Sequence, residues 1–478
     1  MSHVDTHPFF SRRHLTDLLK LVICVLAGGF FWHMPEPGGT DPKGMQIFGV
    51  FLFTILGVVL KPLPAGAICI LSLTTLSLFK VLSFEDAFSG FSNPIVWLIA
   101  SAFFIARGFV KTGLGLRLAH ILIRLMGKNS LGIAYGMTLT DLLLAPAIPS
   151  VTARIGGIVY PVVLSVAKAF DSDPDHSPRR IGGYLIQTIF QTGTVTSAMF
   201  LTAMSGNPMV LNLVKGYGVD ISWGQWALAS IVPGLISLLL IPFILYKIYP
   251  PELKETPEAR QQSADELKKM GDLTANEMWM LGVFVVLIFL WSAGSSWLSA
   301  TLTALIGLSM LMLTRVLTWE DVLKEKGAWD TLVWFATLLT LAGYITKFGL
   351  ASWFGDVVKG HFIGVEWGWG LLILALIYFY VHYFFASNLA HIGALLLPFF
   401  VVAVNLGAPV NLTALVFGFI SSLFGSLTQF GSGPAPILFG ANFVKVADWW
   451  KLGFCISVVN ILIWGVIGSL WWKLLGIF

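Results

Sequence analysis

Two short polar motifs stand out in this sequence because each carries a basic side chain inside an apolar run. The first is Ser150-Val151-Thr152-Ala153-Arg154-Ile155-Gly156, and Ser387-Asn388-Leu389-Ala390-His391-Ile392-Gly393 follows at an offset of 237 residues (387 − 150). An arginine at bilayer depth keeps its proton and therefore needs an anionic partner. Such a pair of motifs in a membrane protein points to an anion carrier whose site lies between two related halves.

The two basic side chains, Arg154 and His391, occupy equivalent positions in their motifs. We expect Arg154 to bind a substrate carboxylate. The alternatives are that it reaches the membrane interface along its aliphatic stem or forms a structural pair with Asp141. We expect His391 either to supply a second donor, charged or neutral, or to be a hydrogen-bonded core histidine.

Two further chain breaks, at 202–208 and 428–434, follow the two motifs and complete the candidate site. The predicted substrate-binding residues are Ser150, Val151, Thr152, Arg154, Thr202, Asn207, Pro208, Ser387, Asn388, Leu389, His391, Thr428, Ser432 and Pro434. Helix capping by the short polar residues and back-bonding by the threonines are the structural alternatives. Interfacial or structural roles are expected for the other ionisable residues near the membrane, namely Lys80, Arg107, Lys111, Lys347 and His382.

The composition predicts a helical membrane protein. Apolar residues make up 56% of the 478 residues and charged residues only 11%, against about 25% charged in a soluble domain. With about 20 apolar residues per crossing, uninterrupted spans are expected near 15–34, 45–60, 62–82, 92–110, 222–247, 277–296, 298–316, 330–346 and 451–474. The net charge of +4 is small, and no nucleic-acid partner, cofactor or metal site is expected.

Shorter matches at nearly the same offset support an internal repeat. Val81-Leu82-Ser83-Phe84-Glu85-Asp86 pairs with Val316-Leu317-Thr318-Trp319-Glu320-Asp321, and Lys111-Thr112-Gly113-Leu114 pairs with Lys347-Phe348-Gly349-Leu350. Each stretch around a serine motif is long enough for two short helices, which predicts a re-entrant hairpin with the motif at its tip. Each half then makes five crossings, and an odd number inverts the second copy relative to the first.

These features predict an all-α polytopic membrane protein with two inverted repeats, each of five transmembrane helices and one re-entrant hairpin. Residues 1–44 would hold an N-terminal segment and one extra helix, 45–249 the first repeat with hairpin 131–170, 250–276 a cytoplasmic linker, and 277–478 the second repeat with hairpin 366–406. The positive-inside tendency places the linker and the N-terminus in the cytoplasm, and the expected location is the cell inner (plasma) membrane. Mixed apolar and basic stretches at 107–128 and 343–359 are expected to lie along the membrane surface.

The motifs also carry a family resemblance. Ala145-Pro146-x-x-Pro149-Ser150-x-Thr152-Ala153-Arg154-x-Gly156-Gly157, Ser387-x-x-Ala390-His391-x-Gly393-Ala394 and Gly431-x-Gly433-Pro434-Ala435-Pro436 resemble the divalent anion:sodium symporter family. More narrowly, they resemble its branch of plastid 2-oxoglutarate/malate translocators and bacterial citrate/succinate and tartrate/succinate antiporters. The resemblance covers nearly the whole chain. It implies a homodimer with elevator-type movement, in which the hairpins and broken helices carry the substrate.

The departures from the family pattern bear on whether transport is coupled to sodium or proceeds by exchange. Sodium-coupled members usually carry Ser-Asn-Thr at the tips, where this chain has Val151 and Leu389, and the branch with basic residues after the motif is associated with exchange. A fixed cation stays on the carrier when the substrate leaves, and carrying an unpaired buried Arg across costs about 2.5 kcal/mol.

We therefore expect an obligate antiporter of the 2-oxoglutarate, malate, succinate and citrate class, and a sodium-coupled dicarboxylate symporter is the alternative. An intramembrane enzyme is not expected, because Asp141 is the one acid close to a motif and paired catalytic groups are missing from the pattern. An anion channel would instead show passive flux that is insensitive to substrate on the far side.

Overall fold

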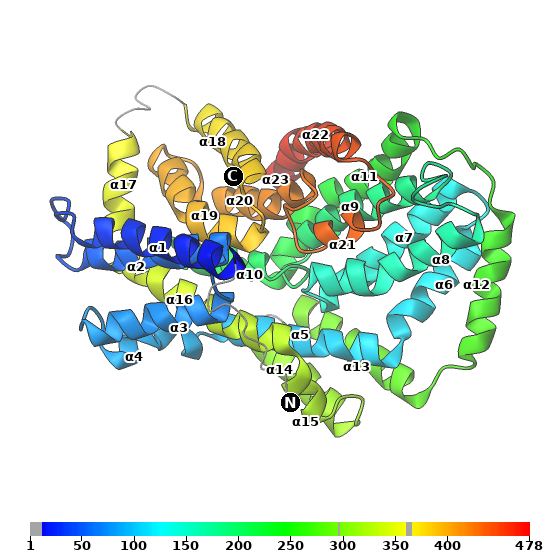
Figure 1. Ribbon diagram of the computed structural model, residues 1–478, viewed down its shortest axis with the longest axis horizontal. Helices are drawn as coiled ribbons and strands as arrows, with labels where there is room; N and C mark the ends of the chain where they lie inside the picture. Colours follow the sequence, from blue (N-terminus) through cyan, green and yellow to red (C-terminus); the bar gives the residue numbers. More distant parts are fainter. Residues whose placement is uncertain (1–11, 295–296, 360–365) are drawn as a thin grey trace, which may run out of the picture. The chain divides into compact units, whose positions relative to one another are not determined.

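The structure is a computed structural model that describes residues 12–294, 297–359 and 366–478 (Figure 1). Every regular element within these ranges is a helix. Eight of the described helices are long and apolar enough to cross a membrane, and four shorter apolar helices accompany them. The expected all-α polytopic membrane fold is confirmed. Residues 1–11 of the expected N-terminal segment, and 295–296 at the end of one expected span, lie outside the described residues.

The first of two compact units comprises Met1–Val96 and Trp329–His361. Its described elements are α1 (Arg12–Trp32), α2 (Gly44–Leu60), α3 (Ala65–Leu78), α4 (Phe84–Ala87), η1 (Ser89–Ser92), most of α16 (Lys326–Lys347) and α17 (Leu350–Lys359). The helices α1 and α2 lie close together where Gly28 and Gly49 face each other. A Cβ atom on Gly49 would lie only 2.5 Å from the carbonyl oxygen of Gly28, and small residues such as glycine permit such a close crossing. The Gly90 amide donates to Thr340 Oγ1 at 3.0 Å, which joins η1 to α16.

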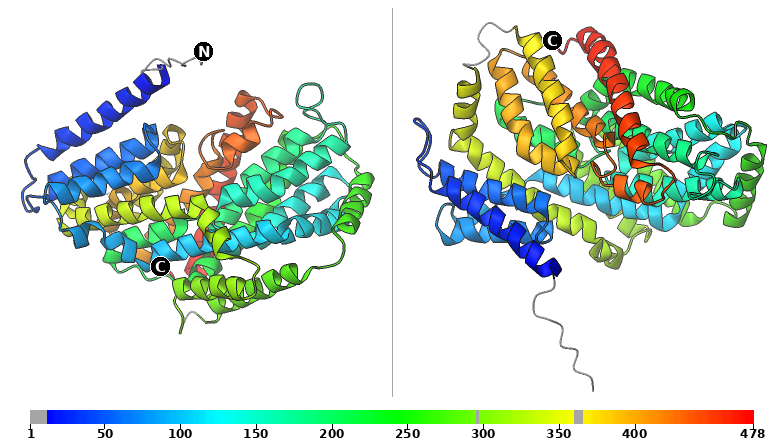
Figure 2. Two further views of the ribbon diagram at one scale, coloured as in Figure 1. Left: turned by 60° about the horizontal axis from the view of Figure 1, so that its bottom comes forward. Right: turned by 45° about the horizontal axis from the view of Figure 1, so that its top comes forward.

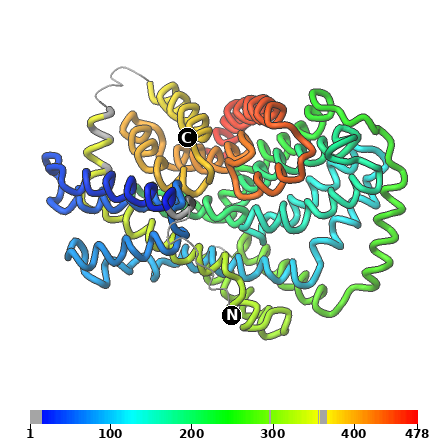
Figure 3. The backbone as a smooth tube through the Cα atoms, in the orientation of Figure 1, coloured from blue at the N-terminus to red at the C-terminus, as the bar shows by residue number. Residues whose placement is uncertain are grey.

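The second unit comprises Trp97–Ala328 and Phe362–Phe478. From the first half of the sequence it holds most of α5 (Pro94–Thr112), α6 (Leu114–Met126), α7 (Ser130–Leu144), η2 (Ala145–Ala147), η3 (Thr152–Val159), α8 (Tyr160–Ala169), α9 (Gly182–Met199), α10 (Gly206–Val214), η4 (Lys215–Tyr217), α11 (Trp223–Ile248) and α12 (Pro257–Met270). From the second half it holds α13 (Ala275–Ser292), α14 (Ala300–Leu313), α15 (Trp319–Lys324), α18 (Trp367–Val381), η5 (His382–Phe384), α19 (Asn388–Asn405), α20 (Val410–Leu423), η6 (Phe424–Ser426), α21 (Ala435–Phe439), α22 (Val446–Leu462), η7 (Ile463–Gly468) and α23 (Ser469–Leu474). Within this unit α18, α19 and α20 lie side by side (Figures 1 and 2), and the colours of Figure 3 let the chain be followed through them.

The repeated sequence segments adopt the same local structure in both halves. Ser83 caps α4 by accepting a hydrogen bond from the Asp86 amide, and Thr318 caps α15 in the same way. Gly113 and Gly349 both have left-handed backbone conformations, with φ of +77° and +83°, at the sharp turns into α6 and α17. Only glycine adopts such a conformation without a steric cost. The repeat is thus visible in caps and turns as well as in the letters of the sequence.

The serine motifs lie where helices are interrupted. In the segment 131–170, α7 passes into the short η2, an extended stretch follows, and the π-helical η3 leads into α8. Pro146 and Pro149 prevent α7 from continuing, since proline lacks an N–H donor. In the segment 366–406, α18 ends in η5 and the chain resumes as α19 after Ser387. Each segment predicted to form a hairpin therefore contains two helices with a break at its motif, and these breaks are the predicted hairpin tips.

The polar segment 250–276 is more ordered than a plain linker. It forms α12, which packs along α6 at one edge of the second unit (Figure 1). The side chain of Arg117 on α6 is buried and donates to both carboxylate oxygens of Glu277, at 2.6 and 3.2 Å. The stretch 107–128, expected as a surface-lying arm, is therefore partly a buried contact, because its central arginine is paired with an acid from the start of α13.

Candidate functional site

The first hairpin tip is organised by its own serine. Ser150 Oγ accepts a hydrogen bond from the Ala153 amide at 3.2 Å, and the Arg154 amide donates to the Ser150 carbonyl at 2.9 Å. Both contacts start the η3 helix, as expected of a capping serine. The side chains of Ser150, Val151 and Thr152 remain half-buried. The tip therefore presents short side chains that a ligand is able to reach.

The guanidinium of Arg154 is fully buried and forms an ion pair with Asp141. Its Nε donates to Asp141 Oδ1 at 2.5 Å, and the exposed fraction of the arginine is 0%. Its Nη1 and Nη2 atoms donate to two carbonyl and two hydroxyl oxygens, those of Ile148 (2.8 Å), Ala203 (2.9 Å), Ser197 (2.9 Å) and Thr196 (3.3 Å). All five N–H donors that an arginine possesses are thereby used.

This arrangement corrects the expectation that a substrate carboxylate is the partner of Arg154. The partner is Asp141, the structural alternative, because the interruption at η2 lets the chain fold back and bring the two side chains together. Thr196 on α9 donates to the second oxygen of the same carboxylate. The pair is therefore neutral as a unit, and Arg154 holds the tip against α7, α9 and the carbonyl of Ala203 without a donor left for a ligand.

The second hairpin tip contains a pair of histidines. Ser387 Oγ accepts from the Ala390 amide at 3.4 Å, which repeats the cap of the first tip. The Nδ1 atoms of His391 and His382 lie 3.0 Å apart, and His382 Nε2 lies 2.8 Å from the carbonyl oxygen of Gly431. Both histidines are fully buried. The expectation of an interfacial place for His382 is wrong, because η5 turns its ring inward onto His391; its structural role is the alternative that holds.

The breaks of the two halves meet through hydrogen bonds and close backbone contacts. Asn207 donates to the carbonyls of Ser197 and Phe200 at 2.7 and 2.9 Å, and its Oδ1 accepts from Ser422 Oγ on α20 at 3.0 Å. A Cβ atom on Gly433 would lie 2.2 Å from Thr152 Oγ1. The first tip therefore touches the break at 428–434, and the break at 202–208 touches α20.

Asn388 and Ser432 are neighbours in the second half of this region. Asn388 Nδ2 donates to the Ser421 carbonyl at 2.9 Å. A Cβ atom on Gly425 would come within 2.7 Å of Asn388 Nδ2 and 3.2 Å of Ser432 Cβ. Leu389 is half-buried and Pro434 is buried beside them. A glycine at 425 therefore lets the second tip and the 428–434 break come together.

Two of the remaining predicted residues have structural partners in the first half. Thr202 Oγ1 donates to the Pro146 carbonyl and accepts from Trp223 Nε1 at 3.0 Å. Pro208 is buried in the first turn of α10. These contacts fix the 202–208 break against η2 and α11, so Thr202 contributes to the shape of the region and has no free hydroxyl proton.

Free hydrogen-bonding atoms remain at the meeting point of the breaks. Among the described residues near it, His391 Nε2, Thr428 Oγ1 and Ser432 Oγ are buried without a partner, as are Gln187 Nε2 and Gln191 Oε1 on α9. Gln191 Nε2 donates to the Ser426 carbonyl at 3.3 Å, which places this glutamine beside the second break. The sequence analysis missed both glutamines. Two amides four residues apart in an apolar helix were the available signal, since polar residues within membrane spans mark functional sites.

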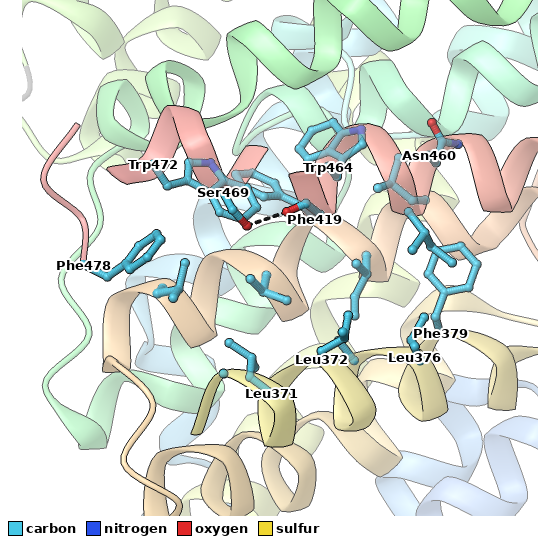
Figure 4. A pocket seen from close by; sticks show the side chains of 18 of the residues that line it. Leu371, Leu372, Leu376, Phe379, Phe419, Asn460, Trp464, Ser469, Trp472 and Phe478 are labelled. Carbon is cyan, nitrogen blue, oxygen red and sulfur yellow. Dashed lines mark hydrogen bonds between the residues drawn. The ribbon is translucent and has the colours of Figure 1, made fainter. Parts of the chain in front are cut away.

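A separate cavity lies between α18, α20 and the C-terminal helices (Figure 4). Its volume is about 290 Å³, and its walls are mainly aliphatic and aromatic, with Asn460 and Ser469 as the polar, non-aromatic side chains among them. No cationic side chain lines it. A dianion would lose most of its hydration there without a cation to compensate for the loss, so this cavity is unsuited to the predicted substrate.

Comparisons with known proteins add to this geometry. Residues 15–478 match the family described as "Sodium:sulfate symporter transmembrane region". The chain is 48% identical over 469 residues, or 98% of each chain, to YflS of Bacillus subtilis, which is named for malate transport. It is 46% identical over 468 residues to "Dicarboxylate transporter 1, chloroplastic" of Spinacia oleracea, covering 96% of this chain and 82% of that one. The solved YdaH transporter of Alcanivorax borkumensis is similar in fold alone, with a TM-score of 0.60 and 12% identity over 96% of this chain and 98% of that chain.

Proposed function

We propose that this chain, which belongs to the sodium:sulfate symporter family, is a secondary active antiporter that exchanges di- and tricarboxylates across the membrane. The substrate class is that of 2-oxoglutarate, malate, succinate and citrate. Relatives named for malate and for dicarboxylates, similar over nearly the whole chain, support this class.

The observation that carries the proposal is the set of unpartnered polar atoms where the breaks meet. Thr428 and Ser432 each hold a hydroxyl group that is buried and has no hydrogen-bond partner. A carboxylate accepts hydrogen bonds through two oxygens, and a buried hydroxyl without a partner costs about 1–3 kcal/mol. A bound carboxylate that accepts from both hydroxyls removes that cost. The half-buried Ser150, Thr152 and Ser387 supply further donors from the two tips.

The same atoms favour exchange over one-way transport. A site that closes empty leaves the hydroxyl groups of Thr428 and Ser432 unpartnered and away from water, whereas a bound carboxylate accepts hydrogen bonds from them. At about 1–3 kcal/mol for each group, the loaded form crosses more readily than the empty one. This reasoning replaces the argument from an unpaired Arg154, which the ion pair with Asp141 removes.

The proposal also includes a homodimer in the plasma membrane with its N-terminus in the cytoplasm. Transport would then occur by elevator-type movement. The division of the chain into two separately packed units supports rigid-body movement. The equivalent caps at Ser83 and Thr318, and at Ser150 and Ser387, support two inverted repeats over 45–249 and 277–478.

Uptake into proteoliposomes tests the exchange. Vesicles loaded with unlabelled malate and empty vesicles receive labelled malate outside, with and without a sodium gradient. We expect fast uptake only into loaded vesicles and no effect of sodium. Equal uptake into empty vesicles that follows the sodium gradient would instead establish the alternative, a sodium-coupled dicarboxylate symporter, which the family description favours.

A pair of threonine variants tests the site. Thr428→Ala removes a hydroxyl without a partner and should raise the apparent KM for malate about tenfold, the equivalent of about 1.4 kcal/mol. Thr413→Ala is the matched control, because Thr413 is also buried but donates at 2.9 Å to the carbonyl of Pro409, the N-cap residue of its helix. Equal kinetics for the two variants would remove Thr428 from the site.

A further inference from the structure

The contact between His382 and His391 determines where their protons lie. A carbonyl oxygen only accepts hydrogen bonds, so His382 Nε2, at 2.8 Å from the Gly431 carbonyl, carries a proton. When His382 is neutral, its Nδ1 is therefore an acceptor. The Nδ1 of His391, 3.0 Å away, must then be the donor of the contact between the rings.

These assignments leave one vacant position for a proton. A neutral His391 that donates through Nδ1 has a free lone pair on Nε2, and this atom is buried without a partner. One more proton on the pair has its natural place on this atom, because the other three ring nitrogens are already engaged. A proton there would turn an unpartnered acceptor into a charged donor.

Among the described residues of the elements that pack on the helix of His391, none carries a carboxylate that could hold that charge. The ring of His391 stacks between Phe385 and Phe424, with centroid distances of 4.6 and 4.5 Å. The elements that pack on α19 are α10, α18 and α20. Their ionisable side chains are Tyr378 and Tyr380 of α18, while α10 and α20 carry none; Tyr378, 4.4 Å from His391 between ring centroids, is bonded to Ser421.

Further ionisable side chains lie on the short helices η5 and η4, next to these elements. His382 contacts His391 from η5, which also carries Tyr383, and Tyr217 from η4 packs on Phe400 of α19. These described side chains include no carboxylate, so a charged His391 needs an anion that these elements do not supply. A dicarboxylate bound at the neighbouring breaks is such an anion.

The fixed charges at the site do not neutralise a dianion. Arg154 and Asp141 cancel each other, so a substrate with two negative charges brings a net charge into a buried place. We propose, building on the transport function proposed above, that His391 Nε2 takes up one proton from water when a dicarboxylate binds and returns it to water when the dicarboxylate leaves. One N–H bond forms at Nε2 on binding and breaks on release, and no other bond changes. Each dicarboxylate then travels with a proton.

Calorimetric titration of the purified protein with malate tests this directly. The titration is run above about pH 7, where both malate carboxyl groups are ionised, in two buffers with different heats of ionisation. The difference in the heats gives the number of protons taken up per malate bound. We expect about one proton for the wild type, and none for His391→Gln, whose amide forms hydrogen bonds but does not titrate.

The control variant is His176→Gln, which removes an exposed histidine in the loop before α9 and should keep the uptake of about one proton. A wild-type protein that binds malate without proton uptake overturns the proposal and leaves the transport function standing. Absence of malate binding to the folded wild type counts against both the transport function and this proposal.

Transport kinetics give a second measurement in case His391→Gln fails to fold. With wild-type proteoliposomes, the apparent KM for external malate should rise by about tenfold for each unit of external pH over the range where the empty site is unprotonated and the loaded site still holds its proton. A KM that stays constant between about pH 7 and 9 contradicts a proton carried with the substrate. Exchange that continues at that constant KM would again leave the antiport itself intact.

Discussion

Replacement of Asp141 by asparagine is the sharpest test of the site as the structure describes it. The substitution keeps the shape of the side chain but removes its charge, so Arg154 loses its counter-ion while it stays fully buried. The same change weakens the hydrogen bond from Thr196. The perturbation is therefore confined to the carboxylate of Asp141 and the hydrogen bonds that it accepts from Arg154 and Thr196.

The expected loss follows from the contact distance and the burial of the pair. At 2.5 Å between Arg154 Nε and Asp141 Oδ1, the Coulomb attraction is about 7 kcal/mol at an effective dielectric constant of about 20. The cost of dehydrating the two groups offsets part of this attraction. Removing one partner of a buried pair typically destabilises by about 3–5 kcal/mol, and we expect Asp141→Asn to lower the free energy of unfolding by that amount.

A double variant separates the structural role from direct substrate binding. In Asp141→Asn with Arg154→Gln, neither buried charge remains, so part of the lost stability should return. Equilibrium unfolding in detergent measures the stability, and calorimetric titration measures malate binding. The folded double variant should still bind malate, because all five N–H donors of Arg154 are used within the protein. A stable single variant, or a folded double variant that no longer binds malate, would refute this account of Arg154.

Three further outcomes are expected. Partial burial raises the pKa of Asp321, but hydrogen bonds from Lys111 and Thr318, together with the Lys111 charge, outweigh it and hold this pKa at about 2. The folded pKa is therefore below the ordinary value of about 3.9. The stabilisation from the ionised carboxylate is present above about pH 4 and is lost as the pH falls towards about 2. Asp321→Asn should therefore lower the thermal unfolding temperature at pH 7, with a gap to wild type that shrinks over that window. Gly433→Ala should slow malate exchange in counterflow assays, since the new methyl group meets Thr152 Oγ1, and Thr152→Ala in the same chain should restore part of the rate. Asn207→Ala should lower the free energy of unfolding by about 3 kcal/mol, because it leaves buried partners without hydrogen bonds; detergent unfolding at wild-type stability would contradict this.

Much of the fold follows from patterns that are local in the sequence. Apolar length identifies the helices, and the proline and glycine positions identify the breaks. The repeated serine predicts two equal caps, which the amides of Ala153 and Ala390 complete. These features are accessible because each depends on a few neighbouring residues.

The partners of the two basic residues were harder to predict. Asp141 and Arg154 meet across an interruption whose geometry depends on the short η2 helix and the π-helical η3, and neither is encoded by a simple periodicity. His382 lies in η5 and His391 lies in α19, with a break in the helix between them. The direction of the His382 ring therefore depends on the conformation of that break. Gln191 reaches Ser426 from a helix that is distant in sequence. Pairings of this kind depend on tertiary packing, which a single sequence does not specify.

The anchoring of Arg117 has a practical consequence for protein engineering. In addition to Glu277, its guanidinium binds the carbonyl oxygens of Met270, Gly271 and Asp272, at 3.3, 2.8 and 3.3 Å. The hydrophilic stretch between the halves looks like a convenient location for a protease site, a fluorescent tag or a split point for co-expression. An insertion at 270–272 would instead pull three carbonyls away from a buried cation, so insertions and fusions should avoid that segment.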